Sequence, residues 1–236
     1  MKKLNLYETC KLHYGKYLYK LAVRNDLAHI FRTDLQKTVK LGYAKVVLDK
    51  LNLQYQNNEP LTRQKYNTLV ELSKNEFLDA MDIYTILRKK NDYKLRCESL
   101  SLAIYSNDRD LLYKIVNKLR TTFIEIWEPA PETAELLLKK QNIKLVNYEP
   151  LLQYQVHLNH KKIDPSFASW LILNQDKSRI GAVALDNIKR GRAGDFYFYV
   201  RDEKVLALVS IIIGHNIRSV DKLVYKGDID KYTYEQ

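Results

Sequence analysis

Between residues 7 and 53, apolar side chains recur three or four positions apart, the spacing that places them on one face of an α-helix. A polar step at Thr33 and Asp34 interrupts the pattern, which therefore predicts two helices. The stretch NLQYQNNEPLTRQ that follows is polar and contains Pro60, which indicates a loop.

A third helix is predicted within SKNEFLDAMDIYTILRKKND. Ser73 and Glu76 have the spacing of a capping box, in which each side chain satisfies a backbone N–H at the start of the helix. Three cations, Arg88, Lys89 and Lys90, lie where the helix dipole is negative. The capping residues and the terminal cations therefore both predict a helix from about residue 73 to residue 90.

The pattern changes after Asp92, where strand-like alternation begins. We expect a basic helical region at 1–92 and an α+β sheet domain at 93–236. The predicted strands are 94–106, 121–128, 142–148, 151–160, 195–200 and 217–226, and the predicted helices are 108–120, 131–140, 164–190 (with a break near Asn174) and 202–213. This is β-α-β-α-β order written twice, over 93–148 and 151–226. It predicts an α+β fold whose helical N-terminal part is followed by ferredoxin-like units with a mixed or antiparallel sheet.

Four aromatic residues fill the predicted strand at 195–200. Successive side chains of a strand point to opposite faces. Phe196 and Phe198 are therefore expected beneath the helices, and Tyr197 and Tyr199 on the other, wetter face. Two tyrosines on an open sheet face would form a platform for stacking bases.

The residues that lead into this strand, KRGRAGDFYFY, are basic and rich in glycine. Four positions (Arg190, Gly191, Ala193 and Tyr197) match the signature of the RNA recognition motif in register, and three (Arg192, Gly194 and Asp195) depart from it. The match identifies no family. Lys189, Arg190 and Arg192 could nevertheless contact phosphates beside the tyrosines, or the segment could be an ordinary solvated loop.

The chain carries a formal charge of +11, and its first 50 residues hold eleven Lys or Arg against four acids. A localised positive charge favours a polyanionic partner, although coding that is rich in A and T also enriches lysine. If the first helices form, Lys11, Lys16, Lys20 and Arg24 lie close to tyrosines on one basic face. Such a face would bind phosphates without reading sequence, or would merely be solvated.

Catalytic and metal-binding motifs are missing from the sequence, including phosphate-binding glycine loops, nucleophile elbows and zinc-ligand patterns. His157 and His160 are three residues apart on a predicted strand and would point to opposite faces, which opposes a shared metal. Glu125 alternates with apolar residues and is expected on a polar face. We predict no metal and no cofactor, and the missing motifs favour a protein without enzymatic activity over an enzyme.

Two cysteines, Cys10 and Cys97, are too few for a disulfide framework, and no apolar run is long enough to span a membrane. The first residues lack the apolar core of a secretory signal. We expect a cytoplasmic protein, in the host cell if the protein is viral, with no membrane partner.

Three hypotheses follow from the sequence. The first is a non-enzymatic nucleic-acid-binding protein, for example a viral or phage accessory factor. The alternative is a structural or assembly protein that acts through protein contacts, as a homo-oligomer or in a virion, because aromatic residues favour interfaces. The second alternative is a metal-dependent nuclease or replication-initiation enzyme that uses His157, His160 or Glu125.

Overall fold

The computed structural model describes residues 3–32, 41–65, 68–121 and 123–229. The chain forms two compact units, the first from residues 1–9 and 16–131 and the second from residues 10–15 and 132–236. Each unit has its own five-stranded mixed sheet, so the predicted α+β class is confirmed. Within these ranges, no helix is long and apolar enough to cross a membrane.

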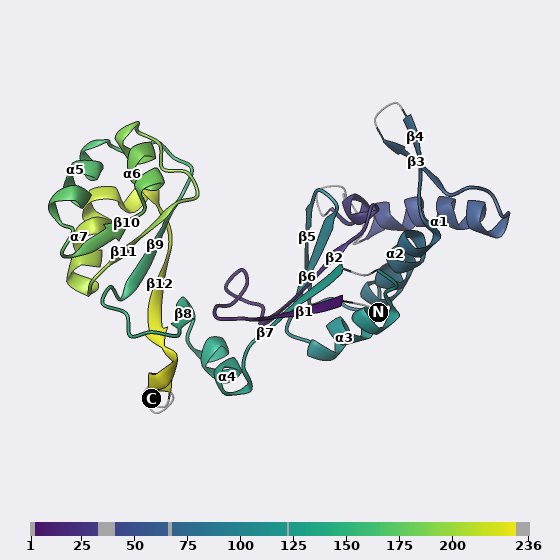
Figure 1. Cartoon of the computed structure of the whole chain (residues 1–236), viewed down its shortest axis with the longest axis horizontal. Coiled ribbons are helices and arrows are strands. Elements are labelled where there is room, and N and C mark those ends of the chain that lie inside the picture. Colours follow the sequence, from purple (N-terminus) through teal and green to yellow (C-terminus); the bar gives the residue numbers. More distant parts are fainter. Residues whose placement is uncertain (1–2, 33–40, 66–67, 122, 230–236) are drawn as a thin grey trace. The chain divides into compact units, whose positions relative to one another are not determined.

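The sheet of the first unit has the strand order β1-β7-β2-β6-β5 (Figure 1). Its strands are β1 (Lys3–Glu8), β2 (Tyr19–Arg24), β5 (Lys94–Glu98), β6 (Ser101–Ser106) and β7 (Phe123–Glu128). β1 pairs with β7 in parallel, and the other neighbouring strands are antiparallel.

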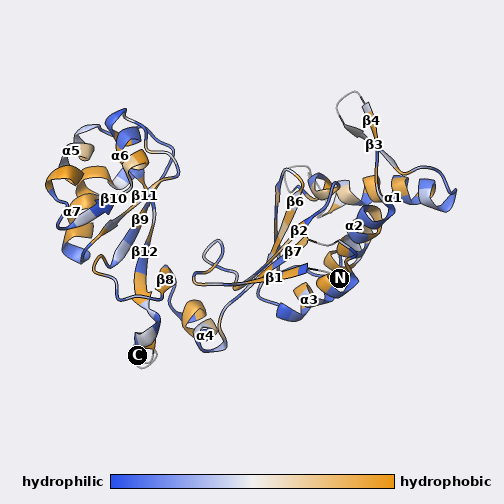
Figure 2. Ribbon diagram, in the orientation of Figure 1, coloured by the Kyte–Doolittle hydropathy of each residue, from blue (hydrophilic) through white to orange (hydrophobic). Residues whose placement is uncertain are grey.

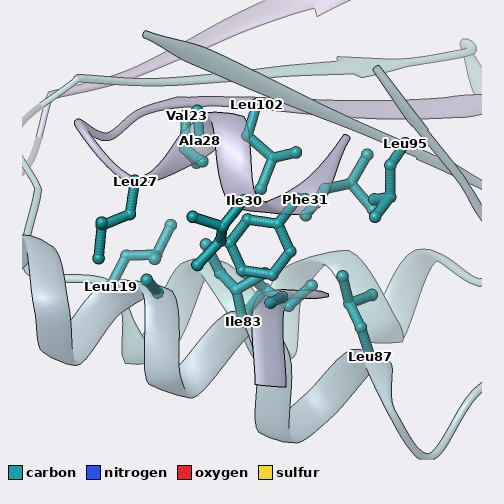
Figure 3. Packing of buried hydrophobic residues seen from close by; sticks show 14 of the residues in the cluster. Val23, Leu27, Ala28, Ile30, Phe31, Ile83, Leu87, Leu95, Leu102 and Leu119 are labelled. Carbon is teal, nitrogen blue, oxygen red and sulfur yellow. The ribbon is translucent and has the colours of Figure 1, made fainter. Parts of the chain in front are cut away.

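Helices cover one face of this sheet and close the first core. They are η1 (Ala28–Phe31), α1 (Gly42–Gln56), α2 (Lys74–Leu87) and α3 (Arg109–Lys118), with a small hairpin of β3 (Thr62–Lys65) and β4 (Thr68–Glu71) between α1 and α2. Figure 3 shows Phe31 of η1 between Leu102 of the sheet and Ile83 of α2. All three side chains are at most 1 % exposed, so η1 fills the space between sheet and helices.

The prediction of a helical start to the chain is wrong, because residues 3–8 and 19–24 are strands. In β2, Leu21 and Val23 are buried against the helices, whereas Lys20 and Arg24 belong to the opposite face. A short alternation of this kind also fits a helical spacing of apolar residues, and pairing with two neighbouring strands decides the outcome. The second predicted helix is present as α1, and the predicted break at Thr33 and Asp34 lies outside the described residues.

Half of the predicted capping box of α2 is confirmed: Ser73 accepts a backbone N–H as expected, whereas the Glu76 carboxylate accepts the Ser73 hydroxyl and the backbone N–H of Asp26. The Glu76 backbone N–H donates to Ser73 Oγ at 3.2 Å, and Ser73 Oγ donates to Glu76 Oε2 at 2.9 Å. Three residues further along, the buried Asp79 carboxylate accepts the backbone N–H groups of Arg120 and Thr121 at 2.7 and 2.8 Å. This carboxylate joins α2 to the chain that leaves α3.

Residues 94–106 form a hairpin rather than the single predicted strand. The turn between β5 and β6 contains Ser99 in the left-handed region, with φ of 53°. Glycine or asparagine usually marks such a turn, and neither is present. Because β6 pairs with β2, one sheet joins residues on both sides of position 92.

The sheet of the second unit has the strand order β10-β11-β9-β12-β8. Its strands are β8 (Ile143–Val146), β9 (Tyr154–Leu158), β10 (Ser178–Ile180), β11 (Tyr197–Val200) and β12 (Ile217–Tyr225), and its helices are α4 (Pro131–Lys139), α5 (Ser166–Leu173), α6 (Ala182–Lys189), α7 (Glu203–Ile213), η3 (Gly214–Asn216) and η4 (Lys226–Asp228). β12 and β8 are parallel, and the other neighbouring strands are antiparallel.

Helices α5, α6 and α7 cover one face of the second sheet (Figure 1). Phe167 of α5, Ile188 of α6 and Val209 of α7 share a buried cluster with Val156 and Phe198 of the strands. The predicted long helix at 164–190 is instead α5, β10 and α6, because β10 leaves the helix layer to pair with β11.

The ferredoxin-like repeat is not confirmed. Strands β5, β6 and β7 belong to the first sheet and β8 to the second, so residues 93–148 do not build one sheet. The other predicted helices and strands are present, as α3, α4, α7, β7, β8, β9, β11 and β12. The local patterns identified these elements, but strand order depends on contacts between residues distant in sequence.

Candidate functional site

Tyr197 and Tyr199 lie on the face of the second sheet opposite α5, α6 and α7. Phe198 and Val200, which alternate with them, are fully buried beneath the helices, whereas the Tyr197 side chain is 46 % exposed and Tyr199 is half-buried. The two tyrosine rings meet edge to face, with centroids 5.6 Å apart. The predicted assignment of faces in β11 is confirmed, and Phe196, which precedes the strand, is partly buried against the same core.

Strand register extends this surface across the sheet. Tyr197 pairs with His157 and Tyr199 with Gln155, and β9 in turn pairs Gln155 with Asp221 of β12. Because paired residues of adjacent strands share a face, these side chains form one surface. We call it the tyrosine face, and it consists of Tyr197, Tyr199, His157, Gln155 and Asp221.

A buried ion cluster lies within the tyrosine face. Asp221 is 1 % exposed, and its Oδ2 accepts a hydrogen bond from Lys11 Nζ and lies 2.9 Å from His157 Nε2. Burial raises the pKa of the Asp221 carboxyl, but the hydrogen bonds with His157 and Lys11 outweigh burial and hold this pKa below its usual value. Asp221 is therefore a fixed negative charge that orients two basic side chains.

The position of Lys11 depends on the segment 10–15, which belongs to the second unit. The Leu145 N–H of β8 donates to the Cys10 carbonyl at 2.8 Å, and this bond anchors the segment beside the sheet. The Lys11 side chain remains 35 % exposed, so its ammonium can meet both Asp221 and solvent.

Further cations lie at the border of the tyrosine face. Arg179 of β10 pairs in register with Tyr199, and Lys144 Nζ of β8 donates to Gln155 Oε1 at 3.0 Å. A pocket of about 310 Å³ opens beside Tyr199, lined partly by Arg179 and Tyr148. Burial, followed by the neighbouring phenols of Tyr197 and Tyr148, raises the pKa of the Tyr199 hydroxyl, so this group is neutral at physiological pH.

The second predicted basic group lies at and after the end of α6. Lys189 and Arg190 are exposed, and the Arg190 guanidinium pairs with Asp186 one turn earlier at 2.8 Å. Arg192 forms an isolated bridge with Lys162. Among the described residues, no hydrogen bond, ion pair or cation–π contact joins these three cations to Tyr197 or Tyr199, so their predicted role beside the tyrosines remains a prediction.

The four N-terminal cations do not share one helical face, which corrects the prediction. Lys11 belongs to the second unit, whereas Lys16, Lys20 and Arg24 belong to the first. Lys16 forms an exposed ion pair with Asp92 at 2.7 Å, and Lys20 Nζ lies 3.6 Å from the centroid of the Trp127 ring. Arg24 is exposed at the end of β2.

Sequence reasoning missed the open face of the first sheet, which carries Trp127. Trp127 is only partly buried, and Tyr7 of β1 stacks on it with centroids 4.8 Å apart. Glu125 lies two residues earlier in β7 and is on the polar face, as predicted. The alternation of buried and open-face positions in FIEIWE was the sequence signal that could have placed Trp127 beside Glu125 on this face.

His157 and His160 contact different acidic side chains. His157 meets Asp221, and His160 Nε2 lies 3.0 Å from Asp195 Oδ2 on an exposed part of the surface. Among the described residues, no three His, Cys, Asp or Glu side chains are grouped so that they could hold a metal ion. The nuclease hypothesis therefore gains no ligand set from this part of the chain.

No protein-family model matches the chain, and no curated protein matches it.

Proposed function

We propose that the protein binds single-stranded nucleic acid on the tyrosine face, without enzymatic chemistry. The observation that carries the proposal is the outward pair Tyr197 and Tyr199 beside a fixed cluster of basic side chains. Aromatic rings stack on bases of any sequence, and nearby cations bind the phosphates that connect them. A double helix hides the faces of its bases, so stacking favours a single strand.

The cations that would meet phosphate are Lys11, Lys144 and Arg179, all at or beside the tyrosine face. With about three phosphate contacts, counterion release predicts a tenfold to twentyfold loss of affinity between roughly 50 and 200 mM salt for a single strand. Because stacking and phosphate contact are separate contributions, salt dependence and aromatic substitution test the proposal independently.

The experiment measures fluorescence anisotropy of labelled single-stranded DNA and RNA of about 20 nucleotides. Tyr197→Ala and Tyr199→Ala are each expected to weaken binding by roughly 1–3 kcal/mol while circular dichroism stays unchanged. Arg179→Gln should reduce the slope of log affinity against log salt by about 0.7.

Tyr43→Ala is the matched control, because Tyr43 is an exposed tyrosine of α1 in the other unit. It should bind as the parent does. Equal affinity of the parent and both tyrosine-face variants, or an affinity independent of salt, would overturn the proposal.

A second candidate is self-assembly, which one feature of α7 favours. Leu208, Ile211 and Ile212 have the i, i+3, i+4 spacing of one helical face and are 45, 82 and 37 % exposed. Figure 2 shows α7 as a largely hydrophobic helix. Exposed apolar surface of this kind is typical of protein interfaces.

If α7 joins two copies, light scattering of the parent should give at least twice the mass of the chain, and Ile211→Lys should return it to a monomer. A monomeric parent at all concentrations would remove this candidate, while nucleic-acid binding could still hold.

A further inference from the structure

A hollow floored by two alanines lies on the open face of the first sheet. Ala22 of β2 pairs in register with Ala103 of β6, and the same row continues to Glu125 on β7 and to Arg96 on β5. Small side chains at the centre of the row leave a hollow of about 340 Å³ between longer ones. We call it the alanine hollow.

An aromatic and basic wall borders the alanine hollow. The neighbouring row of the sheet runs from Trp127 through Lys20 to Tyr105. Tyr17 forms a buried cluster with Tyr105 and Ala103. This side of the hollow is therefore built from fixed rings with one ammonium group between them.

Opposite charges lie at the two ends of the floor. Glu125 and Arg96 are on strands separated by two others, so their backbones are about 14 Å apart at the usual strand spacing. Arg96 pairs with Glu98, and within the described residues no ion pair holds the Glu125 carboxylate. Burial lowers the pKa of the Lys20 ammonium, against the opposing influence of Glu125 and Glu98. The Lys20 ammonium lies over the Trp127 ring of β7, the strand that carries Glu125, so Arg96 is the cation at the other end, where Glu98 also lines the hollow. The Glu125 end can accept hydrogen bonds, and the Arg96 end can meet an anion that displaces Glu98.

A ligand that fits must be flat, must donate N–H groups at one end and must carry negative charge at the other. Nucleotides have this form, and among the common bases guanine offers two adjacent N–H donors on its pairing edge, which match the two oxygens of one carboxylate. We propose that the alanine hollow binds a guanine nucleotide, with the base above Ala22 and Ala103, its N–H edge on Glu125, and its phosphate on Arg96.

This site is in the first unit, whereas the tyrosine face is in the second, so the two proposals fail or succeed separately. The guanine could belong to a free nucleotide or to a strand. The chemistry is the same in both cases, and the experiment separates the two sources.

Trp127 supplies the measurement, because the chain has only two tryptophans and the other, Trp170, can be replaced. In a Trp170→Phe background, GMP is expected to change the fluorescence of Trp127 saturably, with AMP, CMP and UMP binding at least about tenfold more weakly. A parallel titration compares an oligothymidylate with the same strand containing one guanine. Saturation by GMP identifies a free nucleotide, and a response only to the guanine-containing strand identifies a base read within a chain.

Three variants make the test specific. Glu125→Gln should abolish the preference for guanine, and Ala103→Leu should fill the hollow and abolish binding. Ala103→Ser adds one small atom and should retain binding, which separates filling of the hollow from loss of the fold. Tyr197→Ala, on the other sheet, should leave the GMP titration unchanged.

The proposal is overturned if neither GMP nor the guanine-containing strand is preferred. It is also overturned if Glu125→Gln binds all four nucleotides as the parent does while circular dichroism shows an intact fold.

Discussion

Residues 197 and 198 are neighbours in the chain but have opposite energetic roles. Phe198 is fully buried and contacts Phe167 edge to face at 5.5 Å, whereas the Tyr197 side chain is 46 % exposed. Phe198→Ala is expected to cost roughly 3–5 kcal/mol of unfolding free energy, because it leaves a cavity beneath the helices. Tyr197→Ala should cost about 1 kcal/mol or less, and urea denaturation of both variants checks the difference. Equal losses would place Tyr197 in the core.

Tyr93 makes the stability of the first unit sensitive to alkaline pH. Burial in the core raises the pKa of the Tyr93 hydroxyl to about 12, above the ordinary value of 10.0. Its contribution to stability is therefore complete below pH 10 and is lost as the pH rises from about 10 to 12, where only the unfolded chain releases the proton. The loss amounts to about 2–3 kcal/mol. Tyr93→Phe, compared with the parent by denaturation at several pH values, should remove this part of the alkaline sensitivity.

At the scale of elements, two acids of α2 appear equivalent in sequence and differ in structure. Asp79 is 1 % exposed and accepts two backbone N–H groups, whereas the partly exposed Asp82 accepts a hydrogen bond from the Arg120 side chain at 2.8 Å. Asp79→Ala is expected to cost about 2–4 kcal/mol, because it leaves the backbone N–H groups of Arg120 and Thr121 without their acceptor, while the Arg120 guanidinium keeps Asp82. Asp82→Ala, the matched control, should cost about 1 kcal/mol or less. Similar melting temperatures for the two variants would contradict this assignment.

Local patterns predicted α2, α7 and β11, because caps and alternation are contained within each segment. They failed for β2, whose six residues satisfy helical and strand spacing alike until β6 and β7 are present. The candidate site was likewise only partly predictable from the sequence. Alternation alone gave the outward direction of Tyr197 and Tyr199, but no local signal could bring Lys11 to Asp221, 210 residues later.

At the scale of the whole molecule, each unit closes its own hydrophobic core. Ile83 belongs to the core of the first unit and Val209 to that of the second. A cavity should therefore destabilise mainly the unit that contains it, by roughly 0.5–1.5 kcal/mol for Ile83→Val and somewhat more for Val209→Ala. Amide hydrogen exchange is the measurement, with faster exchange expected only in the sheet that borders the altered residue. Equal acceleration in both sheets would show one cooperative core.

The parallel pairing of β1 with β7 has a consequence for synthesis on the ribosome. Lys3 pairs with Phe123, about 120 residues later, and the Cys10 carbonyl pairs with Leu145. Strand β1 and the segment 10–15 are thus translated long before their partners exist, and closing such long loops is slow. Residues 3–13 are therefore translated about 120 residues or more before the strands with which they pair, and they should become protected only after those strands have been made. Their edges must remain unpaired while the intervening residues are being translated.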